Sequence, residues 1–262
     1  MTGNYVLDFD TQFNILLHAE KGEQQLNEAF QSAWNAFYYD EPDLFYIDSS
    51  KLVLLKKYTD LGGIVTHYIS IGPSENGNYL KEEFQTKEKI EEAKEYIKYF
   101  VDQIVEQTKN DTDLQKTRRI HDWIVSFFEY DTNKESKNAY HIYALFDRKA
   151  VCEGYARIFK YLMEEVGVPC ILVSGNATNE QGQTQSHAWN YVQLNYVWYA
   201  VDVTWDDPVI VGEGTLNESA KYKYFLKGSD TFFKDHKEEP EISENSMKFQ
   251  FPTLTKVDYT LN

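Results

Sequence analysis

A helical pattern followed by several strand patterns constrains the fold of this chain more than any other feature. After Cys152, apolar residues recur at steps of three and four, which is typical of a helix with one buried face: Ala156, Phe159, Leu162, Met163 and Val166. Gly167 suits the C-terminal cap of this helix, and Pro169 stops it. CILVSG, HAWNYVQL and VWYAVDVT then predict strands, with a hairpin at Asn195–Tyr196. Helices that precede strands predict an α+β fold.

The upstream sequence predicts further elements. GEQQLNEAFQSAWNAFYY predicts a helix that ends at Tyr39, before the break that Pro42 enforces. KLVLLKKY and GIVTHYISIG predict strands, because β-branched and aromatic residues dominate them. Two more helices are expected in KEKIEEAKEYIKYFVDQIVEQT and in NDTDLQKTRRIHDWIVSFFEYD, the second with Asp111 or Asp113 as its N-cap. We expect residues 1–85 to form an N-terminal α/β accessory region beside a core of residues 86–262.

Composition excludes several classes of protein. Of 262 residues, 42% are hydrophobic and 16% aromatic, which is enough to bury a core. The net charge of −16 argues against nucleic acid or an anionic membrane as a partner, since both require a cationic surface. This charge favours solubility, with steering of cationic substrates as the alternative. Two cysteines cannot form a disulfide scaffold, and no apolar run reaches the ~18 residues of a transmembrane segment.

Cys152 is the candidate nucleophile. It stands at or just before a helix start, where backbone N–H groups and the helix dipole favour the thiolate form. A lone cysteine is more often a small buried hydrophobe. Glu153 and Gly154 are poor core residues, however, so we interpret this position as an opening in the surface. Cys170 has apolar neighbours and is expected to pack at the start of a strand.

His187 and Asp202 are the candidate partners of that thiol. His187 opens a strand after a polar loop, and Asp202 is the one acid within VWYAVDVT, where it requires a partner. An even hairpin loop places His187 opposite Thr204 and Asp202 opposite Trp189. His187 and Asp202 then share a face as diagonal neighbours, with Cα atoms ~7–8 Å apart. An odd loop would separate them.

The other histidines have ordinary interpretations. We expect His121 and His141 to be satisfied helix or loop residues, and His236 to lie in a charged loop. A zinc site is not expected, because Cys152, Cys170 and His187 lack the close paired spacing of structural zinc ligands. No EF-hand loop is present in the sequence, and we expect neither a metal nor an organic cofactor.

Together these segments resemble a known family. VCEGYARIFKYLMEEVGVPCILVSG, SHAWNYVQL and WYAVDVTWDDP resemble the transglutaminase-like superfamily of papain-type fold, in particular bacterial members related to kyphoscoliosis-type peptidases. IHDWIVSFFEYD and YFLKGSDTFFKDH resemble the segments before and after that core, so the likeness covers roughly residues 115–236. It implies a papain/transglutaminase-like catalytic core within 86–262, with the nucleophile helix packed on an antiparallel sheet.

The resemblance also implies residue roles. Cys152 would be the nucleophile, His187 the base and acid, and Asp202 the carboxylate that orients the imidazole. The backbone N–H of Cys152 would contribute to an oxyanion hole, with Tyr140, His141 and Tyr143 as candidates for its second donor. Candidate residues of a substrate groove are Trp189, Trp205, Tyr155 and Tyr143. Alternatively, the two tryptophans fill the core.

Three functions remain open at this level. Attack on an amide gives a thioester, which water resolves in a cysteine peptidase or amidase and an amine resolves in a crosslinking transglutaminase. The alternative is a non-catalytic module that binds peptide or cell-wall material on the same fold. The expected partner is a protein or peptide, with a cell-wall-associated one as the alternative. MTGNYVLDFDTQF lacks the pattern of a signal peptide, which predicts either a cytoplasmic protein or the mature segment of an extracellular or cell-wall protein.

Overall fold

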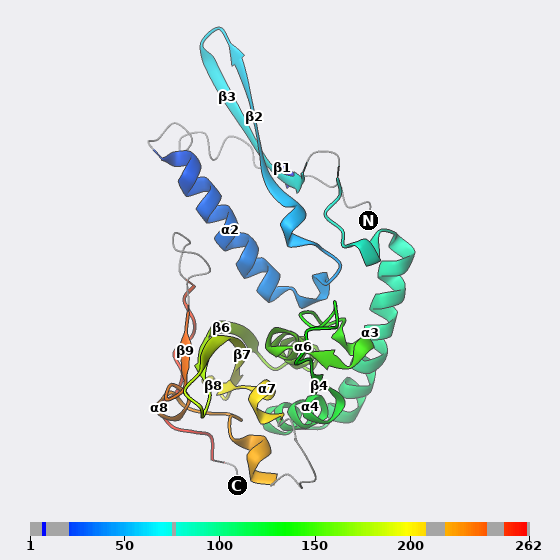
Figure 1. Cartoon of the computed structure of the whole chain (residues 1–262), viewed down its shortest axis with the longest axis vertical. Coiled ribbons are helices and arrows are strands. Elements are labelled where there is room, and N and C mark those ends of the chain that lie inside the picture. The colour runs from blue at the N-terminus through cyan, green and yellow to red at the C-terminus, as the bar shows by residue number, and fades with distance from the viewer. Residues whose placement is uncertain (1–6, 9–20, 75–76, 208–217, 240–248, 261–262) are drawn as a thin grey trace. The chain divides into compact units, whose positions relative to one another are not determined.

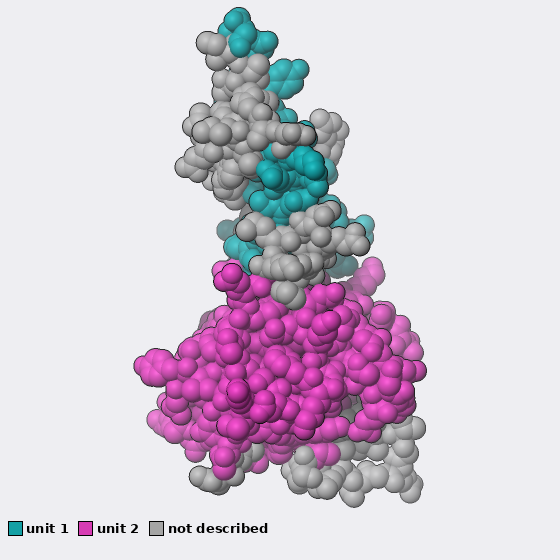
Figure 2. Space-filling view, turned by 90° about the vertical axis from the view of Figure 1, so that its left-hand side faces the viewer, with its two compact units in different colours: residues 1–37, 46–94, 241–248 teal, residues 38–45, 95–240, 249–262 magenta. Residues whose placement is uncertain are grey.

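The computed structural model describes most of the chain as helices and strands joined by short connections (Figure 1). The described residues are 7–8, 21–74, 77–207, 218–239 and 249–260. Its contacts divide the chain into two compact units, coloured in Figure 2. One unit contains residues 1–37, 46–94 and 241–248, and the other contains residues 38–45, 95–240 and 249–262. The domain boundary expected between residues 85 and 86 stays a prediction.

The first unit contains a three-stranded antiparallel sheet in the order β1-β3-β2. Its strands are β1 (Leu7–Asp8), β2 (Leu52–Leu61) and β3 (Ile64–Pro73). Gly62 and Gly63 join β2 to β3 with positive φ angles, which glycine adopts without strain. Leu26 of helix α2 (Gly22–Asp40) and Leu54 and Ile69 of the sheet line one apolar groove. The helix and both strands predicted for this region are confirmed.

Helices dominate the segment that leads to the second sheet. α3 (Lys87–Thr108) and α4 (Asp113–Phe127) lie where the sequence predicted them. The expected N-cap of α4 was wrong, because Thr112 occupies this position rather than Asp111 or Asp113. The Thr112 hydroxyl accepts from the backbone N–H of Gln115, whose side chain accepts from the N–H of Thr112. Short elements follow: β4 (Glu129–Tyr130), α5 (Ala144–Asp147) and β5 (Lys149–Ala150), with β4 and β5 paired in parallel.

Helix α6 (Cys152–Glu165) is buried around most of its circumference. Two of its buried side chains are cationic, and both have partners in the last turn of α2. Arg157 donates to Glu153 and to the backbone carbonyl of Tyr38 at 2.6 Å. Lys160 donates to the carbonyl of Asp40 at 2.8 Å and pairs with a glutamate one turn later. These contacts satisfy charges that would otherwise destabilise a buried helix.

A four-stranded antiparallel sheet in the order β8-β7-β6-β9 completes the second unit. Its strands are β6 (Cys170–Thr178), β7 (Thr184–Leu194), β8 (Val197–Val201) and β9 (His236–Glu238). Leu194 pairs with Val197, so the predicted hairpin at Asn195–Tyr196 is confirmed, and of the two loop lengths considered it has the even one, with two residues. Asn195 and Tyr196 both have positive φ, as a type I′ turn requires.

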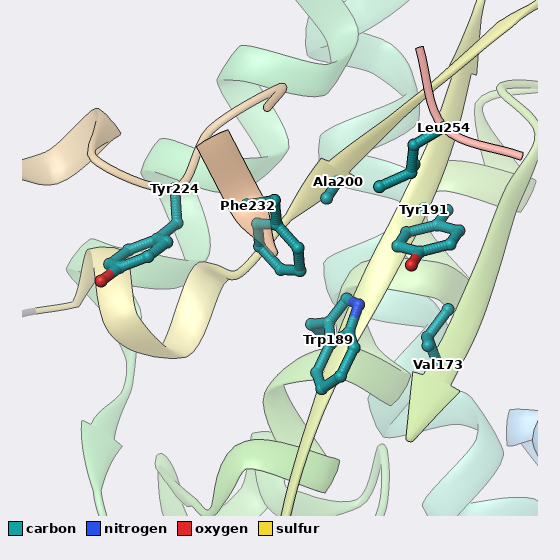
Figure 3. Close-up of a cluster of buried hydrophobic side chains, with 7 residues drawn as sticks. All are labelled: Val173, Trp189, Tyr191, Ala200, Tyr224, Phe232 and Leu254. Atoms are coloured by element: carbon teal, nitrogen blue, oxygen red, sulfur yellow. The ribbon is translucent and has the colours of Figure 1, made fainter. Parts of the chain in front are cut away.

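The two faces of β7 pack against different partners. Ala188 lies with Ala156 of α6 and Leu172 of β6 on one face. On the other face, Trp189 and Tyr191 belong to an aromatic cluster (Figure 3). The cluster also contains Val173, Ala200, Tyr224, Phe232 and Leu254, of which Phe232 belongs to α8 (Ser229–Phe232). This alternation fixes the register of β7 against its neighbours, because a slip of one residue would exchange the faces.

The last predicted strand was too long. VWYAVDVT was expected to remain extended, but β8 ends at Val201 and a short helix, α7 (Val203–Asp206), begins one residue after Asp202. The remaining assigned segments are 3₁₀ turns: η2 (Pro42–Leu44), η3 (Ser49–Lys51), η4 (Glu82–Phe84) and η5 (Glu218–Tyr222). The predicted α+β class, with a helix packed on an antiparallel sheet, is confirmed. Among the described residues, no helix is both long and apolar enough to cross a membrane.

Gly154 fixes the start of α6 against the segment before it. A Cβ at this position would lie 2.0 Å from the carbonyl oxygen of Ala139, which also accepts the N–H of Val151 at 3.0 Å. We therefore expect Gly154→Ala to lower the free energy of unfolding by about 3 kcal/mol through steric overlap. Gly167→Ala, at the other end of α6, meets open space and costs only the strain of its positive φ, about 1 kcal/mol. Urea unfolding compares the two, and a Gly154→Ala protein as stable as the wild type would contradict the expected clash.

Candidate active site

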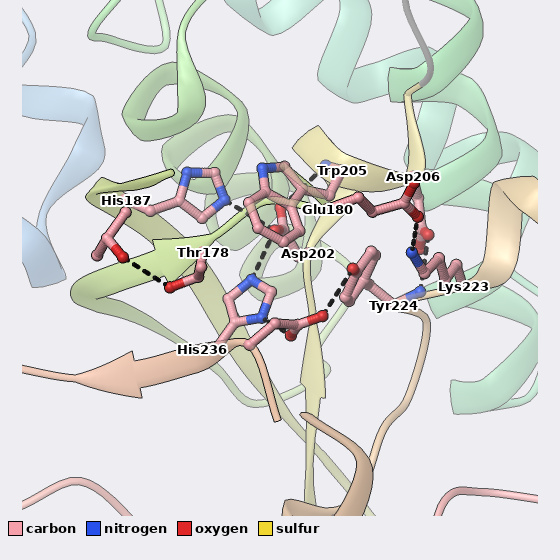
Figure 4. A network of polar contacts seen from close by, with 11 residues as sticks. Thr178, Glu180, His187, Asp202, Trp205, Asp206, Lys223, Tyr224 and His236 are labelled. Atoms are coloured by element: carbon pink, nitrogen blue, oxygen red, sulfur yellow. Dashed lines mark hydrogen bonds and ion pairs between the residues drawn. The ribbon is translucent and has the colours of Figure 1, made fainter. Parts of the chain in front are cut away.

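The carboxylate of Asp202 is the centre of the candidate site. It is fully buried and accepts four hydrogen bonds, two on each oxygen. Oδ1 accepts from the backbone N–H groups of Thr204 and Trp205 at 3.0 and 3.2 Å, since Asp202 is the N-cap of α7. Oδ2 accepts from His187 Nε2 at 2.8 Å and from His236 Nε2 at 3.1 Å (Figure 4). Burial would raise the pKa of this carboxyl, but the charges and hydrogen bonds of the two histidines hold it well below its usual range.

His187 lies on β7, and the carboxylate of Asp202 fixes the orientation of its ring. Its side chain is buried, and Nε2 makes the bond to Asp202. Burial would lower the pKa of the imidazole, but the charge and hydrogen bond of Asp202, together with the thiol of Cys152, raise it to about 10. The other ring nitrogen, Nδ1, is buried and makes no hydrogen bond of ordinary geometry. Cys152 raises the pKa of this imidazole, so its thiol lies close to the ring.

Cys152 and His187 line the same cleft, which has a volume of about 420 Å³. Cys152 is the first residue of α6 and is partly exposed. The cap residue of this helix, Val151, offers no side-chain oxygen to the first turn. The thiol therefore stands where the N-terminal backbone N–H groups of α6 favour negative charge. Cys170 is buried in β6 as expected, and burial raises the pKa of its thiol.

The residues expected to wall the groove lie elsewhere. Trp189 and Tyr155 are buried in the core, and Tyr143 stacks on Phe45. Trp205 is half-buried and packs against the rings of His187 and His236. None of these four belongs to the lining of the cleft. Three other tyrosines take that place, alongside polar and charged side chains of several elements: Tyr39, Tyr130, Tyr140, Lys134, Glu153, Ser174, Gln185 and Ser186.

Of the three candidates for a second oxyanion donor, one lines the cleft and two do not. Tyr140 lines the cleft with Cys152. His141 instead shares a hydrogen bond of 3.0 Å with the hydroxyl of Tyr38, and Tyr143 is stacked away from the cleft. Tyr130 was missed by the sequence interpretation. It lines the cleft, and burial followed by the charge of Cys152 raises the pKa of its phenol to about 12, so its hydroxyl stays a donor at neutral pH.

His236 is the largest departure from expectation at this site. It was expected in a charged loop, but it is the first residue of β9, it is 2% exposed and it contacts Asp202 directly. The prediction failed because lysines and acids surround His236 in the sequence, and β9 is only three residues long. His121, by contrast, is a satisfied helix residue as expected, with hydrogen bonds to Asp122 and to the buried Asp206.

His187, Asp202 and His236 are also a group of potential metal ligands. Their ligand atoms all lie within 4.8 Å of one another. The donor set of two imidazoles and a carboxylate suits several transition metals. The hydrogen bonds within the group argue against this fit, because both Nε2 atoms already donate to Asp202 and a metal ion would have to displace both protons.

Comparison with known proteins relates the segment that contains this site to a known family. A model of the transglutaminase-like superfamily matches residues 98–203, which include the positions of Cys152, His187 and Asp202. This match relates residues 98–203 to the transglutaminase-like superfamily. Mouse kyphoscoliosis peptidase is 32% identical over 138 residues, and the match covers 48% of this chain and 21% of the mouse protein. The human protein of that name is 31% identical over 140 residues with the same coverage.

Solved structures of transglutaminase-like proteins are more distant. The match to the crystal structure of a TGase covers 65% of this chain and 48% of the TGase chain, at 16% identity and a TM-score of 0.39. The periplasmic domain of TgpA from Pseudomonas aeruginosa covers 54% of this chain and 56% of its own, at 16% identity and a TM-score of 0.33. The matched part of the chain spans about a fifth of the length of its curated relatives, 21%. The expected superfamily is confirmed, and bacterial origin stays a prediction.

The two thiols are expected to differ sharply in reactivity. In the folded protein, iodoacetamide should modify Cys152 and leave Cys170 intact, since Cys152 is partly exposed at the cleft and Cys170 is buried with a raised thiol pKa. Peptide mapping after brief labelling measures this. In urea both cysteines should react, which controls for labelling efficiency. Modification of Cys170 at the same rate as Cys152 in the folded protein would contradict the placement of the two thiols.

The His187–Asp202 pair predicts how stability depends on pH. The pKa of His187 is raised from about 6.5 to about 10 on folding, so its stabilisation is complete below pH 6.5 and is lost as the pH rises towards 10. We expect the wild type to lose a few kcal/mol of unfolding free energy relative to His187→Gln between pH 7 and pH 10. Urea unfolding of both proteins across this range measures the difference. A constant difference would show that the imidazole is not protonated in the folded protein.

Proposed function

We propose that this protein carries out thiol-dependent acyl transfer at amide bonds, with Cys152 as nucleophile, His187 as base and acid, and Asp202 as orienting carboxylate. The observation that carries this proposal is the buried 2.8 Å bond between His187 Nε2 and Asp202 Oδ2, which leaves Nδ1 for the thiol that lines the same cleft. The match of residues 98–203 to the transglutaminase-like superfamily supports it.

The first half of the reaction forms a thioester. The thiolate of Cys152 attacks the carbonyl carbon of an amide, and the carbonyl oxygen becomes an oxyanion that the backbone N–H of Cys152 stabilises. Tyr130 and Tyr140 are the candidates on the cleft wall for a second donor. The imidazolium of His187 donates its proton to the nitrogen of the leaving amine. The C–N bond then breaks, the amine departs and the acyl group remains on sulfur.

The second half decides between hydrolysis and crosslinking. His187 removes a proton from water or from an amine, and that nucleophile attacks the thioester and releases the thiol. Water gives an acid and a peptidase or amidase, whereas an amine gives a new amide and a transglutaminase. We favour hydrolysis because the curated relatives are named peptidases. The substrate is a protein or peptide, and a cleft lined by tyrosines and polar groups suits such a chain.

The second candidate function is binding without turnover. The cleft that contains Cys152 also contains uncharged polar and aromatic side chains that would hold a peptide. Incubation with peptide libraries containing glutamine, followed by intact-mass measurement, distinguishes the candidates. An acyl adduct on Cys152 that forms with release of ammonia or amine, and then decays to the acid or to a new amide, supports catalysis. Tight peptide binding with no adduct and no product supports the binding module.

Substitution of each triad residue provides the quantitative test. Cys152→Ala and His187→Gln should each lower kcat by at least ~10³-fold, and Asp202→Asn by ~10²–10⁴-fold, because each breaks the same proton-transfer unit. Cys170→Ala removes the other thiol without touching the cleft and should retain the activity of the wild type. Turnover of a chromogenic peptide amide measures these rates. Full activity of Cys152→Ala would sink the proposed mechanism.

A further inference from the structure

Oδ2 of Asp202 accepts a hydrogen bond from a second imidazole, which the proposed mechanism does not use. His236 Nε2 lies 3.1 Å from Oδ2, the same oxygen that accepts the proton of His187 at 2.8 Å. Asp202 lies between the two rings (Figure 4). His236 stands outside residues 98–203, which the family model matches. The side chains of His236 and Asp202 are fully buried, so water does not compete for the hydrogen bond between them.

We propose that His236 is a positioning residue that holds the carboxylate of Asp202 in place for His187, an inference that rests on the acyl transfer proposed above. With His236 present, each oxygen of Asp202 has two donors and the carboxylate cannot tilt about its Cβ–Cγ bond without losing one. Without it, Oδ2 would retain His187 alone. Because Asp202 orients His187, a tilt at Asp202 becomes a displacement of Nδ1 relative to the thiol.

His236 is itself fixed by a hydrogen bond on its far side. Its Nδ1 lies 2.6 Å from Asp235 Oδ1, and Asp235 Oδ2 accepts the hydroxyl of Tyr224 at 2.9 Å. Both ring nitrogens of His236 therefore face carboxylate oxygens. Carboxylates only accept hydrogen bonds, so a proton on either ring nitrogen has an acceptor, and the two contacts together fix the plane of the ring.

Aromatic rings hold His236 in this orientation. Phe232 stacks on it with a centroid distance of 4.0 Å and an interplanar angle of 21°. Trp205 and Trp189 approach at 4.7 and 5.2 Å with inclined planes. The backbone is anchored as well, since the N–H of Thr178 donates to the carbonyl of Asp235 at 2.8 Å. A ring packed in this way keeps Nε2 directed at Asp202.

The test compares three variants by the alkylation rate of Cys152 and by turnover. His236→Phe keeps an aromatic ring but removes the donor, and we expect it to slow alkylation and lower kcat at least ~10-fold with little change in KM. His236→Gln places an amide N–H near the position of Nε2 and should recover most of that loss. His121→Phe is the matched control, because His121 is an equally buried histidine whose acid partner is Asp206. It should leave both rates unchanged.

Four results would contradict the positioning role of His236. Wild-type rates in His236→Phe, or a Gln variant no faster than the Phe variant, would overturn it, as would an equal loss in His121→Phe. A loss of alkylation after dialysis against a chelator that zinc restores would show that the group binds a metal instead. The proposed function fails separately, if Cys152 of the wild type reacts no faster than a free thiol and no substrate turns over.

Discussion

A single buried carboxylate organises the candidate site. Asp202 carries a negative charge in a fully buried position, and such a charge is tolerated only when donors surround it. Its four hydrogen bonds come from three different parts of the chain: the start of α7, His187 on β7 and His236 on β9. The same contacts also hold the imidazole of His187 in the cleft that Cys152 lines, so stability and the proposed chemistry depend on one arrangement.

The scaffold brings the thiol to that arrangement by burying α6 almost completely. Arg157 and Lys160 reach the last turn of α2, and Gly154 allows the first turn to lie against the carbonyl of Ala139. The β7–β8 hairpin brings Asp202 to the site, because its two-residue turn sets which residues of the two strands share a face. A helix and a hairpin, each fixed by packing, therefore converge on one cleft.

Local patterns predicted much of this arrangement, and long-range contacts account for what they missed. The helix after Cys152 and the register that unites His187 with Asp202 follow from periodicity and from an even turn. His236 could not be recognised in this way, because the rings around it come from other elements. Trp189 and Trp205 lie far from it in the sequence, and Phe232 belongs to α8. The lining of the groove could not be predicted for a related reason. The tryptophans near the site were assigned either to the groove wall or to the core, and Trp189 fills the aromatic cluster of the core, whereas Tyr39 reaches the cleft from α2.

The protonation state of His187 tests this account most directly. Nitrogen NMR of the histidine side chains at pH 8 distinguishes an imidazolium from a neutral ring, with the His187 signal assigned by its absence in His187→Gln. Because Asp202 raises the pKa of His187 to about 10, the ring should carry both protons in the wild type and should become neutral in Asp202→Asn. A neutral His187 in the wild type at this pH, or a doubly protonated ring in both proteins, would contradict the claim that the buried carboxylate controls the site.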